Sequence, residues 1–84
     1  MTNLHPLREG DFVIAVPING SQVEAISKHT CPYEFRREFH RLYQTGACGE
    51  DPLAYQMIMD PSDNSLMTRP LEDIIDRERA IRYN

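Results

Sequence analysis

Residues 12–27 carry the clearest pattern of apolar and polar positions in the chain. An apolar run over 12–18 leads to Asn19-Gly20, and a second, partly apolar run follows over 21–27. Asn-Gly readily adopts the two positive φ values of a type I′ turn, whose twist matches that of the flanking strands. The pattern therefore predicts a tight β-hairpin. A two-residue turn at this position pairs Val16 with Val23 and Ile14 with Ala25.

The period then changes to that of a helix, because Phe35, Phe39 and Leu42 recur at i, i+4 and i+7. This stripe predicts a helix over about 31–46, which Thr30 or Cys31 can cap at its start and Gly46 ends. The opposite face of this helix is basic. It carries Arg36, Arg37, His40 and Arg41.

The second half of the chain predicts two more strands and a helix. Apolar runs over 53–59 and 66–69 flank a polar turn at 60–65, and a helix begins at about Pro70 and extends to about 82. Its inward stripe is expected to contain Leu71, Ile74, Ile75 and Ile81. The fold class is therefore α+β, with a small antiparallel sheet and two helices.

Composition limits this architecture to one small domain, residues 1–84. With 84 residues, 40% of them hydrophobic, the chain is near the size at which buried area only just offsets chain entropy. Small domains often gain buried area by self-association, and four Tyr, three Phe and four Met provide material for an interface. We therefore expect a homo-oligomer.

The net charge of −4 argues against general nucleic-acid binding, which depends on many Lys and Arg side chains. No apolar run approaches the roughly 20 residues of a membrane span, and the first residues lack the pattern of a secretory signal. We expect a cytoplasmic protein without membrane contact, in which Cys31 and Cys48 are reduced thiols.

Several short matches resemble a small bacterial domain family of unknown function. They are Gly10-Asp-Phe, Asn19-Gly20 to Val23, Ile26, Lys28-His29-Thr30, Ala54-Tyr55-Gln56 and Arg69-Pro70-Leu71-Glu72. The family has an early Tyr-x-Val strand, a His-Ser-Glu-Thr stretch, a Val-Tyr strand and a late Trp-x-Arg-Pro-Leu motif. The resemblance implies a bent, SH3-like sheet of four to five strands and no established activity.

Two features depart from that family. Met67 stands where the family has its tryptophan, and the helix at about 31–46 is an insertion after His29-Thr30. Small folds diversify by adding sites to a retained scaffold, so the inserted helix is where we expect this protein's own function.

Metal and thiol chemistry are the weaker alternatives. The chain has five side chains of types that bind soft metals: His5, His29, Cys31, His40 and Cys48. They lack the paired spacing of structural zinc sites. Cys31 at a helix start, two residues from His29, invites a nucleophile interpretation, yet no third residue orients the base. We expect no enzyme activity, no metal and no cofactor.

The basic helix face is the best candidate for a binding surface, because guanidinium groups make two-pronged contacts with carboxylates and phosphates. The alternative is internal pairing with Glu34, Glu38 or the acidic segment 50–65. Arg69 is a further candidate, although it could instead pair with Glu72 or Asp73. Tyr55 could line a ligand site or belong to the core.

Two functions follow from these candidates. The first is a small non-enzymatic protein that covers a partner protein's surface with the Arg36 to Arg41 helix and the 50–65 segment, as phage or mobile-element inhibitors of host machinery do. The alternative is a homo-oligomer that binds an anionic, nucleotide-like small molecule through Arg69, the helix arginines and Tyr55.

Overall fold

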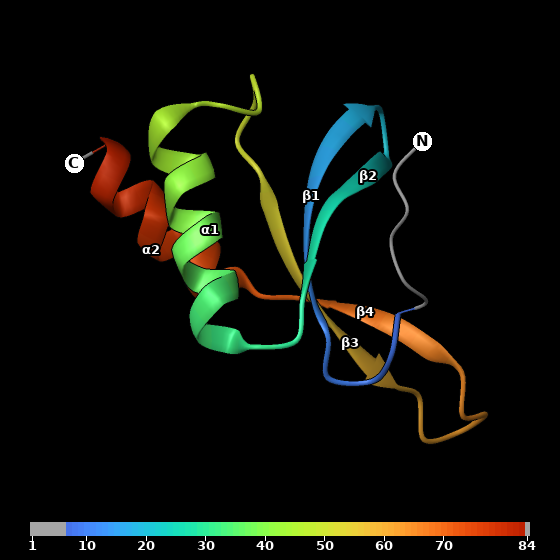
Figure 1. Ribbon diagram of the computed structural model, residues 1–84. Coiled ribbons are helices and arrows are strands. Elements are labelled where there is room, and N and C mark those ends of the chain that lie inside the picture. Colours follow the sequence, from blue (N-terminus) through green and yellow to red (C-terminus); the bar gives the residue numbers. More distant parts are fainter. Residues whose placement is uncertain (1–6, 84) are drawn as a thin grey trace.

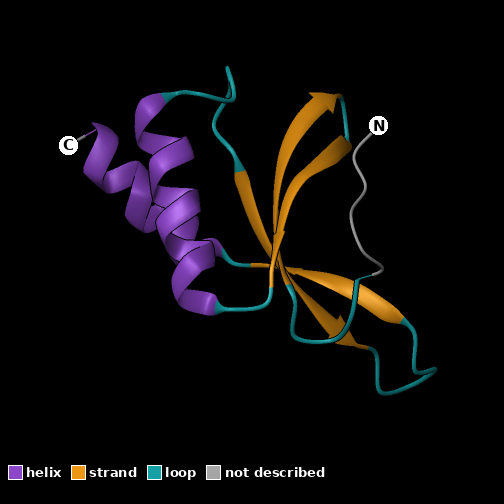
Figure 2. Ribbon diagram, viewed as in Figure 1, coloured by secondary structure: helices purple, strands orange, loops and turns teal. Residues whose placement is uncertain are grey.

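The structure is a computed structural model that describes residues 7–83. Along the chain, two strands and a helix are followed by two more strands and a second helix (Figure 1). The elements are β1 (Phe12–Asn19), β2 (Gln22–His29), α1 (Pro32–Thr45), β3 (Leu53–Met59), β4 (Leu66–Pro70) and α2 (Glu72–Tyr83). All three strand pairs are antiparallel, in the order β2-β1-β3-β4. The predicted α+β class is confirmed, with four strands. Figure 2 shows the two helices together on one side of the sheet.

The predicted hairpin of β1 and β2 forms, but its turn lies one residue later than expected. Asn19 pairs with Gln22, so Gly20 and Ser21 make the turn. Gly20 has a φ of 44°, whereas Asn19 has no positive φ, so the predicted type I′ turn is wrong. One positive φ at the first turn residue is the pattern of a type II′ turn, which also suits the twist of a hairpin.

The predicted pairing of Ile14 with Ala25 and of Val16 with Val23 is therefore also wrong. Ile14 pairs with Ser27 instead, and the register shifts between Ile14 and Ala15 because Ile26 is an extra residue in β2. Such a bulge re-aims a side chain. Here Ile26 packs against the core. A second register shift lies between Pro17 and Asn19, next to the turn, so the displaced turn and these two irregularities together change the pairing.

The core lies between the sheet and α1. Phe35, Phe39 and Leu42 are buried, which confirms the predicted stripe, and Gly46 ends α1 with a left-handed φ of 70°. Pro32 is the first helical residue, and Cys31 precedes it. Aromatic rings continue the stripe along the helix, since the ring centroids of Phe35 and Phe39 are 6.2 Å apart. The rest of the core cluster is Ile14, Tyr43, Ala54 and Ile75.

The last helix differs from its prediction at its start and in one residue of its inward stripe. Pro70 ends β4, opposite Tyr55, and α2 begins at Glu72. Ile75 is 4% exposed, as predicted, but Ile81 is 52% exposed and Glu78 is only 7% exposed. Leu71 and Ile74 pack against the core, so three residues of the predicted stripe are confirmed and only Ile81 is wrong. The carboxylate of Glu78 is turned toward α1 instead of Ile81.

Candidate functional site

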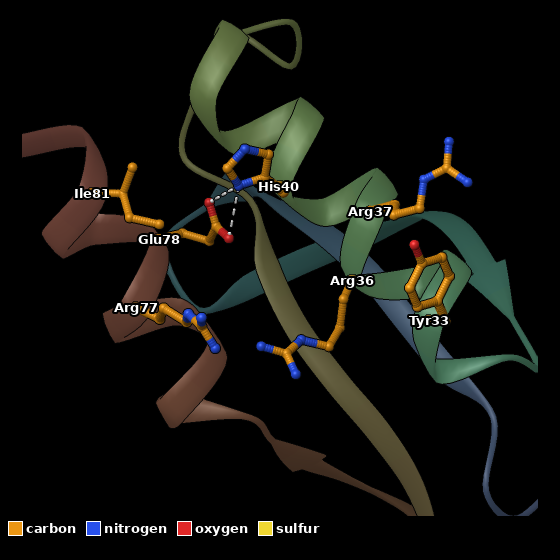
Figure 3. Close-up of a pocket in the computed structure, with 7 residues that line it drawn as sticks. All are labelled: Tyr33, Arg36, Arg37, His40, Arg77, Glu78 and Ile81. Carbon is orange, nitrogen blue, oxygen red and sulfur yellow. Dashed lines mark hydrogen bonds and ion pairs between the residues drawn. The ribbon is translucent and has the colours of Figure 1, made fainter.

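A groove of about 500 Å³ runs between α1 and α2 (Figure 3). Positions three and four apart share one helix face, so the groove receives several side chains from each helix. From α1 these are Tyr33, Arg36, Arg37 and His40, and from α2 they are Arg77, Glu78 and Ile81. Three of the four predicted basic residues of α1 therefore line one surface.

Hydrogen bonds from α1 to Glu78 hold the two helices together. His40 Nδ1 lies 2.9 Å and 3.1 Å from the two carboxylate oxygens of Glu78, a geometry in which an Nδ1–H donates to both oxygens. Gln44 Nε2 donates to Glu78 Oε1 at 2.8 Å and to the Glu78 carbonyl at 3.0 Å. The one acidic side chain that lines the groove is thus already occupied by donors from the protein itself.

The arginines of the groove have no such partners. Among residues 7–83, the guanidinium groups of Arg36, Arg37 and Arg77 form no ion pair and no hydrogen bond. Other helix arginines do have them: Arg41 pairs with Glu38, Arg79 with Asp76, and Arg82 with Asp51. The groove therefore concentrates three positive charges that make no ion pair within residues 7–83.

The groove arginines also differ in direction. Figure 3 shows the guanidinium groups of Arg36 and Arg77 pointing toward each other across the groove, below the His40–Glu78 contact. Arg37 points away from them, with its guanidinium carbon 5.9 Å from the centroid of the Tyr33 ring. Tyr33 is 70% exposed. The groove thus combines a basic centre with exposed carbon surface at Tyr33 and Ile81.

Arg41, the fourth predicted residue of the basic face, is tied to its own helix. Its Nε and Nη2 donate to the two oxygens of Glu38 at 3.0 Å and 2.7 Å. The hydrogen bond from Arg41 lowers the pKa of Glu38. The internal pairing considered from the sequence therefore applies to Arg41, but not to Arg36 or Arg37.

Arg69 and Tyr55 lie away from the groove. Arg69 Nη2 donates to Gln56 Oε1 at 2.7 Å, and within residues 7–83 it makes no ion pair with Glu72 or Asp73. Tyr55 follows the buried Ala54 along β3, so it points to the opposite face of the sheet from the core cluster. Within a single chain, neither Arg69 nor Tyr55 lies beside the arginines of the groove.

The acidic segment 50–65 has mainly structural contacts. Asp51 accepts from Arg82 Nη1 at 2.8 Å and from the hydroxyl of Tyr43 at 3.3 Å. Asp60 shapes its turn by accepting from the amide and hydroxyl of Ser62, which lowers the pKa of Asp60. Figure 1 places the 60–65 turn at the end of the sheet away from the helices, so this part of the acidic segment lies apart from the basic face of α1.

Four residues of the groove are not among the candidates that the sequence indicates: Tyr33, Arg77, Glu78 and Ile81. The i, i+4 spacing of Arg77 and Ile81 is a visible signal of a shared helix face. Apolar spacing alone predicts Ile81 in the core, because it contains no information on the hydrogen bonds that His40 and Gln44 make to Glu78.

The thiols and the remaining imidazole have ordinary surroundings. The His29 ring contacts Ser27, with 2.6 Å between Nε2 and Oγ, and Cys31 precedes α1 without a side-chain capping bond. Burial raises the pKa of the Cys48 thiol. Across residues 7–83 no three His, Cys, Asp or Glu side chains gather as metal ligands do, and His5 lies outside the described residues.

Neither α1 nor α2 has the length and apolar character of a membrane span.

Comparison of the chain with protein-family models, with curated proteins and with solved structures finds no match. The SH3-like resemblance therefore stays a prediction.

Proposed function

We propose that this protein is a non-enzymatic binding module that docks an acidic surface of a partner protein in the groove between α1 and α2. The observation that carries the proposal is that Arg36, Arg37 and Arg77 line one groove without an ion pair or hydrogen bond from their guanidinium groups among residues 7–83.

The composition of the groove suits a protein partner. Arginine and tyrosine are enriched where partners bind most tightly, since a guanidinium makes directional contacts and an aromatic ring buries much area at little entropic cost. Tyr33 and Ile81 are large, exposed and adjacent to the basic centre. A partner surface that combines carboxylates with apolar side chains would match both features.

Charge reversal tests this function. Arg36→Glu combined with Arg77→Glu reverses the charge of the groove. Arg79→Glu is the control, because it reverses the charge of an arginine of α2 that does not line the groove. Proteins captured from bacterial lysate by the wild type and by the Arg79→Glu control should be lost with the groove variant and at high salt. An unchanged set of captured proteins would remove the groove from consideration.

A cytoplasmic inhibitor of host machinery, encoded by a phage or a mobile element, is one role that such a module fills. That part of the proposal comes from the size and charge of the chain. Its test is the identity of the captured partner, because an inhibitor should reduce the activity of a partner enzyme at stoichiometric concentration.

Self-association through β4 is a second part of the proposal. β4 is an edge strand, and it exposes Leu66 and Met67 beside Met59 of β3. Exposed apolar edge strands readily pair with another chain. Arg69 lies near one end of β4 and Asp63 precedes the other, so an antiparallel second copy brings unlike charges together.

Backbone hydrogen bonds define how two copies could pair. The amide of Leu71 donates to Ala54, and neighbouring residues of a strand point their amides in opposite directions. Leu66 and Thr68 therefore turn their N–H groups outward, while Pro70 has none to offer. An antiparallel partner centred on Met67 would join Leu66 to Thr68 in both directions.

Sedimentation equilibrium of Met67→Lys tests the dimer, with Ile18→Lys at the exposed hairpin tip as the matched control. Dissociation in Met67→Lys alone supports the β4 contact, and an equal change in both variants contradicts it. The alternative function, binding of a nucleotide-like ligand, also requires a dimer. Arg69 and Tyr55 lie away from the helix arginines of their own subunit, so they would have to join the helix arginines of a second subunit. A thermal-shift screen against nucleotides tests that alternative, since ligand at 100 times its Kd stabilises by about 2.7 kcal/mol.

A further inference from the structure

Arg36 and Arg77 form a facing pair of cations in the lining of the groove. They come from different helices, and their guanidinium groups point toward each other (Figure 3). Like charges repel, and an anion between the two groups would turn that repulsion into attraction on both sides. Glu78 does not fill that place, because both of its oxygens accept from His40 and one also accepts from Gln44.

The charge and shape of this site distinguish between anions. A carboxylate has two oxygens and one negative charge, and a single guanidinium fork satisfies it. A phosphate monoester carries a charge of about −1.5 to −2 and three acceptor oxygens, so it can accept from two forks at once. Two converging guanidinium groups therefore match a phosphate monoester better than one carboxylate.

The flanks of the groove indicate what carries the phosphate. Tyr33 and His40 are seven residues apart, which is about 10 Å along α1. About three residues of extended peptide cover that distance. Exposed carbon surface at Tyr33 and Ile81 would contact apolar atoms beside the phosphate, whereas a free phosphate ion would leave it unused.

We infer that Arg36 and Arg77 clamp a phosphate monoester, presented on a phosphorylated side chain of the protein partner with apolar groups beside it. This inference rests on the proposed function and names the group that anchors the partner.

The first test uses phenyl phosphate as the probe, with benzoate and inorganic phosphate for comparison. Side-chain Nε–H signals of the arginines in ¹⁵N-labelled protein report binding at each guanidinium. Phenyl phosphate should shift the Arg36 and Arg77 signals and bind about tenfold more tightly than benzoate, because charge-assisted hydrogen bonds are worth more to a dianion with more acceptors. Inorganic phosphate should shift the same signals at higher concentration.

Conservative variants locate the clamp. Arg36→Lys and Arg77→Lys keep the positive charge but remove the fork, so each should weaken phenyl phosphate binding by about tenfold. Arg79→Lys changes an arginine of α2 that lies outside the groove, and it should leave the affinity unchanged. Equal affinity for benzoate, unmoved Arg36 and Arg77 signals, or equal losses in all three variants would each overturn the clamp.

A second test separates the clamp from the proposed function. Lysate is treated with a phosphatase before capture by the wild-type protein. Loss of the groove-dependent partner after treatment supports the phosphorylated side chain as the anchor. Capture that survives treatment, yet is still lost with Arg36→Glu and Arg77→Glu, leaves the partner function standing and overturns the phosphate clamp. Capture that does not depend on these arginines removes the partner function, while phenyl phosphate binding would still report the clamp.

Discussion

The orientation of α2 decides whether the groove exists, and two isoleucines of that helix test it. Ile75 is 4% exposed and belongs to the core cluster, whereas Ile81 is 52% exposed at the rim of the groove. Truncating a buried isoleucine to alanine removes contacts and leaves a cavity, which costs about 2–5 kcal/mol. The same truncation at an exposed position usually changes stability by about 0.5 kcal/mol or less.

Urea denaturation followed by circular dichroism measures this difference. Because the whole domain could have only about 5 kcal/mol of stability, Ile75→Val is the better variant, with an expected loss of about 0.5–1.5 kcal/mol. In a domain of this size each kcal/mol lowers the Tm by about 4–8 °C. Ile81→Val should leave the unfolding midpoint unchanged.

The slope of the denaturation curve is the control, since an unchanged slope means that the change lies in stability rather than in the compactness of either state. A loss in Ile81→Val as large as that in Ile75→Val would refute the reasoning. Ile81 would then be buried, as the apolar pattern alone predicted, and Arg77 would not face Arg36.

Three more outcomes follow from local features. Gly20→Ala should destabilise the protein by about 1 kcal/mol in urea denaturation, because Gly20 has a φ of 44° that a Cβ disfavours; no change would contradict the observed turn. Cys48 should react with Ellman's reagent at pH 8 more slowly than a free cysteine, because burial raises the pKa of its thiol; an equal rate would contradict that burial. Hydrogen bonds from Ser62 lower the pKa of Asp60 below its ordinary value of 3.8, so the stability that Asp60 contributes is present at neutral pH and is lost as the pH falls below about 4. Denaturation curves of Ser62→Ala should therefore show a weaker dependence on pH below 4 than those of the wild type.

The features that could be predicted from the sequence are those that local physics determines. The apolar spacing of Phe35, Phe39 and Leu42, with Gly46 after them, locates α1 within one residue at each end. Asn19-Gly20 locates the hairpin but not the turn residues. The turn residues depend on the pairing of the two strands, which shifts between Pro17 and Asn19 and again at Ile26.

The candidate site could be predicted only in part, for the same reason. Arg36, Arg37 and His40 were identified because they share one face of one helix. The contribution of α2 depends on hydrogen bonds between His40 and Glu78, which are 38 residues apart in the chain. Apolar periodicity favours Ile81 as an inward residue. In the structure Glu78 is inward instead, because His40 and Gln44 donate hydrogen bonds to its carboxylate.

The central claim is that Arg36 and Arg77 serve a partner and not the fold, and thermal unfolding at low salt tests it most directly. Arg82 is the matched comparison, because its Nη1 donates to the Tyr43 carbonyl at 2.9 Å and to Asp51 at 2.8 Å. Arg36→Gln and Arg77→Gln should keep or raise the Tm by relieving repulsion, whereas Arg82→Gln should lower it. A Tm lowered by Arg36→Gln or Arg77→Gln as much as by Arg82→Gln would contradict the claim.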